Sequence, residues 1–177
     1  MRGLDLLNEG DEGLIVIDPL TCEETGAAAL GLYQAYHYPG KKRPIKAIIY
    51  IYPYINHFGC VRNFITGEDV EKNKVKILAL EGFLEHAVLE NIYTGIALSQ
   101  RAAYMYGAVL AWGPTGQISV GLGQAVPIRN IKLIPPNISI SRIGDTKTVN
   151  SVSIEVQILS FHPVYRMPGQ FVEIHRL

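Results

Sequence analysis

Cysteine is scarce in this sequence, which contains Cys22 and Cys60 and no other thiol. Two cysteines cannot build a disulfide framework or a four-thiolate zinc site within one chain. So low a content is typical of proteins from a reducing compartment. We therefore expect a chain that depends on a hydrophobic core, which 177 residues are enough to build as one domain covering 1–177.

Net charge is also lacking, because 16 lysine and arginine residues balance 16 aspartate and glutamate residues. A chain without excess positive charge is not expected to bind nucleic acid specifically. Charged residues make up only 18% of the chain and hydrophobic residues 48%, which favours partial cover of the surface by other subunits. Acidic residues gather before residue 25 and basic residues after residue 128, which suits head-to-tail contact between copies or an arrangement within one chain.

Long uninterrupted hydrophobic runs are missing as well. The N-terminus, MRGLDLLNEGDEG, carries acidic residues where a signal peptide needs a basic start. The most apolar stretch, 92–112, contains Ser99, Gln100 and Arg101 near its middle, which a lipid-facing span would not tolerate. We therefore expect no signal peptide and no membrane partner, a location in the cytoplasm or in a virion, and a buried helix at 92–112.

The apolar pattern predicts both strands and helices. Residues 13–19 read as a buried strand, and Thr21 and Glu24 have the spacing of a capping box for a following helix. Small residues in 26–31 would let that helix approach a neighbour closely. Further strands are predicted at 45–54 and 75–80, with 58–66 as a partner for the first of these.

From residue 81 onward the apolar spacing changes to three and four, which predicts a long helix over about 81–112. The remainder alternates in the manner of strands, with candidates at 117–126, 128–134, 137–143, 147–161 and 170–176. The predicted fold is therefore α+β, with N-terminal strands and two helices, one of them long, packed on a mainly antiparallel C-terminal sheet.

One candidate for catalysis is the pair of His57 and Cys60, which could act as base and nucleophile. Such a base usually has a partner that orients it, and the local sequence offers only Asn56 or Asn63. The alternative interpretation is that Cys60 is a small buried hydrophobic residue.

A second candidate is a metal site on the predicted long helix. His86 and Glu90 are four residues apart and share a helix face, and Glu85 is adjacent, so that a carboxylate and an imidazole could bind one ion. The alternative is a solvated helix face. No cofactor is predicted from the sequence.

Several polar residues are candidates for ligand or subunit contact. Arg101 interrupts an apolar helix, where a buried guanidinium needs an ion pair, a subunit contact or an anionic ligand. In the predicted strand 147–161, Glu155 and Gln157 point away from the core, and His162 lies at the strand's end before Pro163. We interpret these three as residues of an interface.

Two functions remain open. The first is a structural subunit that assembles with copies of itself and with other structural subunits into a ring or tube; segment 128–145 resembles virion proteins of tailed phages, particularly tail or neck components. The second is a small enzyme or ligand-binding protein with a pocket between the long helix and the sheet, lined by His57, Cys60, His86, Glu90 and Arg101.

Overall fold

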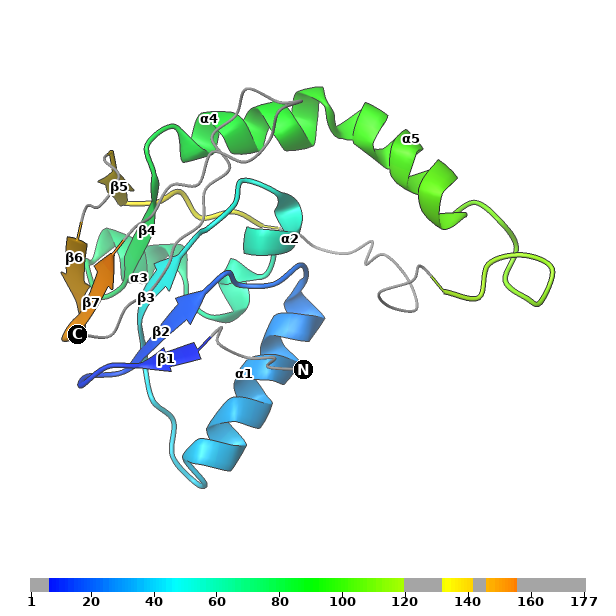
Figure 1. The fold of residues 1–177 in the computed structure, drawn as a ribbon. Helices are drawn as coiled ribbons and strands as arrows, with labels where there is room; N and C mark the ends of the chain where they lie inside the picture. Colours follow the sequence, from blue (N-terminus) through cyan, green and yellow to red (C-terminus); the bar gives the residue numbers. More distant parts are fainter. Residues whose placement is uncertain (1–6, 120–131, 142–145, 156–177) are drawn as a thin grey trace.

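The computed structural model describes residues 7–119, 132–141 and 146–155. Its centre is a five-stranded sheet in the order β1-β2-β3-β4-β5, which is parallel from β2 to β5 and antiparallel between β1 and β2 (Figure 1). The strands are β1 (Leu7–Glu9), β2 (Leu14–Ile17), β3 (Ile45–Ile49), β4 (Lys76–Leu80) and β5 (Ile138–Ile140).

The parallel strands are short apolar runs that are buried on both faces of the sheet. Val16, Ile48 and Ile77 point to one face and belong to a first core cluster. Their neighbours Ile15 and Ile49 point to the opposite face and belong to a second cluster. Continuous apolar runs of this kind are typical of parallel strands, since both sides of such a sheet are covered.

Helices cover the first face of the sheet. Phe58, Val61, Phe83 and Ala87 pack there around the buried ring of Tyr50, whose hydroxyl donates to the carbonyl of Ile134. The helical elements are α1 (Glu23–His37), α2 (Ile55–Phe58), η1 (Val61–Asn63), α3 (Gly67–Glu71), α4 (Phe83–Val88), the π-helical turn η2 (Leu89–Tyr93) and α5 (Gly95–Tyr106).

The start of α1 packs closely against the segment that follows α2. A Cβ atom placed on Gly26 would lie 2.5 Å from Sγ of Cys60, so only glycine fits this contact. Of the predicted run 26–31, Gly26 makes this close approach, whereas Ala27, Ala28 and Gly31 are exposed. Helix α1 itself begins one residue after the N-cap Cys22, and not at a Thr21 capping box.

A two-stranded antiparallel hairpin covers the second face. It consists of β6 (Thr146–Val149) and β7 (Val152–Glu155), and the side chains of Val149, Val152 and Ile154 pack against the second core cluster. Asn150 in the turn holds the hairpin to the loop before β2: its Oδ1 accepts from the N–H of Glu12, and its Nδ2 donates to the carbonyl of Gly13.

The fold is a mixed α/β fold, which corrects part of the α+β prediction. The central sheet is mostly parallel and most of its strands come from the N-terminal half, whereas the predicted sheet was antiparallel and C-terminal. Antiparallel pairing in the described C-terminal part is limited to the β6–β7 hairpin. The predicted strands 128–134 and 170–176 lie largely or wholly outside the described residues, and so does the greater part of 117–126.

The predicted strand 58–66 is wrong. The segment continues α2 into η1, because Phe58, Val61 and Ile65 are buried at spacings of three and four and not of two. The predicted single strand 147–161 is interrupted as well. Asn150 and Ser151 have positive φ angles of 53° and 62°, which turn the chain back into a hairpin.

The predicted long helix 81–112 is divided into α4, η2 and α5. The part from residue 92 onward is not buried: α5 contains no buried residue, and it leads away from the sheet (Figure 1). The apolar spacing predicted the helix correctly but did not show that its apolar side chains are exposed. Among the described residues, no helix is long and apolar enough to cross a membrane.

Candidate functional site

The candidate site lies at the edge where β2 and β3 end. Asp18 follows β2 directly, and Tyr52, Tyr54 and His57 follow β3. In a parallel sheet the carboxyl ends of neighbouring strands meet at one edge, and that edge is where open α/β sheets bind ligands. We call these four residues the edge site.

The backbone fixes Asp18 in an unusual conformation. Its N–H donates to the carbonyl of Ile49 at 2.9 Å and extends the β2–β3 pairing by one residue. Its φ of 56° lies in the left-handed region, which few non-glycine residues adopt. Strained backbone conformations of this kind are frequent at functional sites. Here the positive φ angle turns the chain sharply into Pro19.

Asp18 and His57 form a hydrogen-bonded pair. Nδ1 of His57 lies 2.7 Å from Oδ2 of Asp18, and the two side chains are 25% and 19% exposed, so the pair is sheltered but reachable. Because a carboxylate only accepts, Nδ1 is the donor in this contact, and a neutral ring in this position has its proton on Nδ1. Nε2 then keeps its lone pair, which is the arrangement of an oriented general base.

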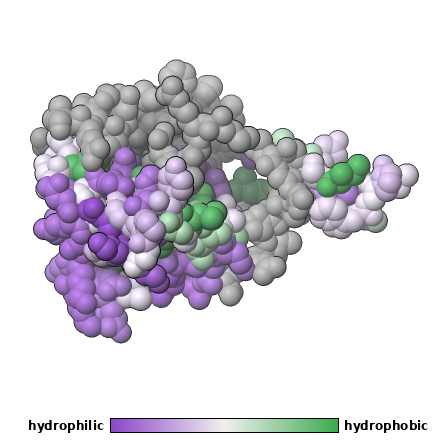
Figure 2. All heavy atoms as spheres, turned by 90° about the horizontal axis from the view of Figure 1, so that it is seen from below, coloured by the Kyte–Doolittle hydropathy of each residue, from purple (hydrophilic) through white to green (hydrophobic). Residues whose placement is uncertain are grey.

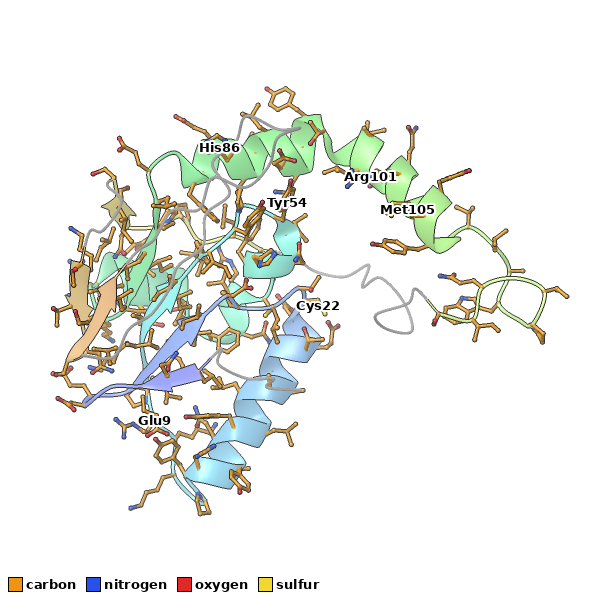
Figure 3. All side chains as sticks on the ribbon, viewed as in Figure 1. Glu9, Cys22, Tyr54, His86, Arg101 and Met105 are labelled. Carbon is orange, nitrogen blue, oxygen red and sulfur yellow. The ribbon has the colours of Figure 1, made fainter. Side chains whose placement is uncertain are left out.

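Aromatic rings form one wall of the edge site. The rings of Tyr52 and Tyr54 are stacked with centroids 4.9 Å apart, and the ring of Tyr52 lies 5.4 Å from that of His57. Tyr54 is the N-cap of α2, below the α4–α5 layer (Figure 3). Such a wall offers apolar faces and phenol hydroxyls to a bound molecule.

Asn91 in the π-helical turn holds the loop that carries these rings. Its Nδ2 donates to the carbonyl oxygens of Pro53 and Ala87, at 2.9 and 2.7 Å, and its Oδ1 accepts from the N–H of Ile55 at 3.3 Å. The wide π turn thus links the α4–α5 layer to the edge site. Such turns are frequent at functional sites.

The edge site does not have the donors of a metal centre. Asp18 and His57 supply two side chains of the usual ligand types, and their nearest atoms bond to each other. Tyr52, Tyr54 and Asn56 supply phenols and an amide. Across the described ranges there is no group of three or more histidine, cysteine, aspartate or glutamate side chains that could hold a metal ion. The buried Oδ1 of Asp18 has no hydrogen-bond partner among the described residues.

Cys60 lies close to His57 in sequence but bonds elsewhere. Its thiol is fully buried and donates to the carbonyl of Pro19 at 3.1 Å. Burial raises the pKa of the Cys60 thiol to about 12, so it stays protonated at neutral pH. The geometry gives His57 the carboxylate of Asp18 as its partner, and not the thiol.

The residues of the predicted metal site differ in burial. Glu85 is exposed, His86 is half-buried, and Glu90 is buried in η2, where its Oε2 accepts a long hydrogen bond from Thr94 at 3.4 Å. The change from α-helix to π-helix at Leu89 alters the spacing on which the shared face depended.

The predicted interface residues are scattered. Arg101 is exposed on α5 and makes no ion pair with a described residue, so the expected buried guanidinium is absent (Figure 3). The backbone of Glu155 pairs with Thr146 in the hairpin. Gln157 and His162 lie outside the described residues.

Sequence reasoning found His57 but missed Asp18. It sought the partner of the histidine among neighbours in sequence, whereas the partner is 39 residues away. The available signal was an acidic residue directly after the buried run 14–17, at a strand end that would meet the end of 45–49 only in a parallel sheet.

No family model matches the chain, but individual proteins do. It is 42% identical over 159 residues to a linear primary-alkylsulfatase and 41% identical over 163 residues to an (R)-specific secondary-alkylsulfatase, both from Pseudomonas sp.. These matches cover 88% and 89% of this chain but 23% and 24% of the relatives. The chain thus spans about a quarter of the length of the curated relatives it matches.

The solved structures give the same result. A stereoselective inverting sec-alkylsulfatase from Pseudomonas sp. superposes with a TM-score of 0.79 at 37% identity, over 96% of this chain and 26% of that chain. These similarities point to an enzyme and overturn the prediction of a phage tail or neck subunit, since the proteins that match at 37–42% identity are alkylsulfatases. The alternative that the sequence left open, a small enzyme, agrees better with them.

Proposed function

We propose that this chain forms part of an enzyme that hydrolyses sulfate esters of alkyl alcohols, with the edge site as its reacting centre. The observation that carries the proposal is the sheltered pair of Asp18 and His57 at the carboxyl edge of the sheet, in a chain about 40% identical to alkylsulfatases over most of its length. Asp–His pairs of this geometry serve hydrolases as oriented bases.

In the proposed reaction, Nε2 of His57 accepts a proton from water while the water oxygen attacks the ester. The bond between the alkyl oxygen and either carbon or sulfur breaks, and the imidazolium of His57 then returns its proton to the oxygen that leaves, so that the products are an alcohol and hydrogen sulfate and the imidazole is neutral again. Asp18 is a positioning residue, which keeps the proton on Nδ1 and stabilises the imidazolium that forms. The rings of Tyr52 and Tyr54 offer apolar faces to the alkyl chain.

The test uses a chimaera in which this chain replaces the matching quarter of the (R)-specific secondary-alkylsulfatase, so that the protein has full length. Sulfate release is measured from a primary and a secondary alkyl sulfate, with an alkyl phosphate of equal chain length as control. We expect release from the sulfates only. Water labelled with ¹⁸O then places the label in the alcohol if carbon is attacked and in sulfate if sulfur is attacked.

Substitutions in the same chimaera test the two roles. We expect His57→Ala to lower the turnover number by about 10²–10⁴-fold, the usual contribution of a general base, and Asp18→Asn to lower it less. His37→Ala is the matched control, since His37 is exposed at the far end of α1. A folded chimaera that releases no sulfate, or one that keeps its rate without His57, rules the proposal out.

A further inference from the structure

A second feature of the molecule, separate from the edge site, is an exposed apolar segment. Residues 92–118, which we call the arm, run through α5 and the turn after it and stand clear of the sheet (Figures 1 and 2). Hydrophobic side chains along it face solvent, with Tyr104 92% and Val109 82% exposed. The other large exposed side chains of the arm are Ile92, Tyr93, Ile96, Met105, Tyr106, Leu110, Trp112 and Ile118.

The arm is almost without charge. Arg101 is the only charged residue between Ile92 and Ile118. Surfaces of this kind on a folded domain mark contacts with another polypeptide, because a solvated helix normally carries charge on its outer face. The partner of the arm should therefore be apolar and neutral, with one acidic group opposite Arg101.

The area is sufficient for a stable contact. The four aromatic side chains Tyr93, Tyr104, Tyr106 and Trp112 have about 150–250 Å² each to bury, and they are 41–92% exposed. Together with the six aliphatic side chains of the arm, they approach the roughly 800 Å² per partner of a standard interface.

The arm is also continuous with the edge site. An open groove of about 560 Å³ runs along its base, lined by Ile55, Glu90, Ile96 and Ser99 among others. Ile55 belongs to α2, the helix that carries His57. A polypeptide seated in this groove would therefore contact the start of α2, directly beside Tyr54 of the edge site.

We propose that the arm is the docking surface for a polypeptide equivalent to the remaining three-quarters of the alkylsulfatases, in the same chain or in a separate one, and that its docking completes the edge site. The length argument favours this occupant over a second copy: the relatives continue for about three times the matched length, and 96% of this chain superposes on a quarter of one of them. Only the second part of this inference, that docking completes the edge site, rests on the proposed function.

The experiment compares melting temperatures in two settings, the 177-residue chain alone and the chimaera with the secondary-alkylsulfatase. Tyr104→Ser and Val109→Ser are placed in the arm, and Tyr36→Ser on α1 is the matched control because Tyr36 is 83% exposed. We expect the arm substitutions to lower the melting temperature of the chimaera by several degrees and to leave that of the chain alone unchanged, with the control neutral in both.

Melting does not depend on sulfate release, so a failure of the proposed function is distinguishable from a failure of this inference. Equal effects in the two settings, or no effect in the chimaera, would overturn the inference. A chain that dimerises on its own in light scattering, and stops doing so when Tyr104 or Val109 is replaced, would assign the arm to a second copy instead. If the chain alone has no melting transition, the inference is tested in the chimaera only: it holds if the arm variants melt at a lower temperature than the control variant, and it fails if they do not.

Discussion

Asp18 combines three properties that rarely occur together: a positive φ angle, a sheltered carboxylate, and one oxygen bonded to an imidazole while the other is without a partner among the described residues. The positive φ angle and the unpaired oxygen cost stability, and the backbone turn places the carboxylate at the strand edge. The sequence indicates such a residue only as Asp-Pro after an apolar run. Its role depends on the parallel pairing of β2 with β3, which local patterns do not contain.

Cys60 gives a pH prediction at the same scale. Its pKa is raised to about 12 by burial, above its ordinary value of 9.0, so the folded state keeps the proton where the unfolded state loses it. The stabilisation that the protonated thiol gives is therefore complete below about pH 9 and is lost as the pH rises toward 12. Urea unfolding at several alkaline pH values should show this decline.

The Cys60→Ala variant isolates the contribution of the thiol from that of other alkaline titrations. We expect it to be less stable at pH 7, because the thiol fills space against Gly26, but to lose less stability than the parent above pH 9. Parallel stability profiles for the two proteins would contradict the assignment.

Among the elements, helix α1 offers a matched pair of glycines. A Cβ on Gly26 would meet Sγ and Cβ of Cys60 at 2.5 and 3.1 Å, whereas a Cβ on Gly31 would meet nothing within 4 Å. We expect Gly26→Ala to lower the free energy of unfolding by about 1–3 kcal/mol through overpacking. Gly31→Ala should raise it by roughly 0.5–1 kcal/mol through helix propensity. Denaturant unfolding measures both, and a stabilised Gly26 variant would disprove the close contact.

The elements also show which sequence signals were sufficient. The strands at 14–17, 45–49 and 76–80 and the helix at 23–37 were predictable because each has a strong local pattern, although the capping box predicted at Thr21 for the helix is not formed. The segment 58–66 was wrongly predicted as the partner of the strand 45–54, although its buried residues Phe58, Val61 and Ile65 are spaced three and four apart. The strand 147–161 was misread because its alternation was carried across Asn150, although the buried residues change phase between Val149 and Val152.

On the scale of the whole molecule, strand direction was the main error. Three continuous apolar runs separated by helical segments indicate βαβ units and a parallel sheet. The antiparallel prediction was based instead on the long alternating pattern near the C-terminus. The exposed arm was equally out of reach. An apolar helix has the same sequence pattern whether it is buried in its own domain or covered by another polypeptide.

The side chain of Asn150 joins the β6–β7 hairpin to the loop before β2, about 138 positions earlier in the chain. Substitutions of Asn150 measure how much this link contributes to stability. Asn150→Ala leaves the N–H of Glu12 and the carbonyl of Gly13 without their partners and places alanine at a φ of 53°. We expect a loss of about 1–3 kcal/mol in the free energy of unfolding. Asn150→Gly removes the same hydrogen bonds but tolerates the φ angle, so it should lose less; an equal loss would show that backbone strain contributes nothing.

Strands β4 and β5 are neighbours in the sheet, yet residues 81–137 lie between them, and this connection contains α4, η2 and the arm. The free energy needed to close such a connection grows only slowly, by about 0.6 kcal/mol for each doubling of its length. The arm can therefore gain, lose or exchange residues in the course of evolution while the registers of β4 and β5 stay the same. Substrate preference and partner choice can diverge in this one connection without redesign of the sheet that positions His57.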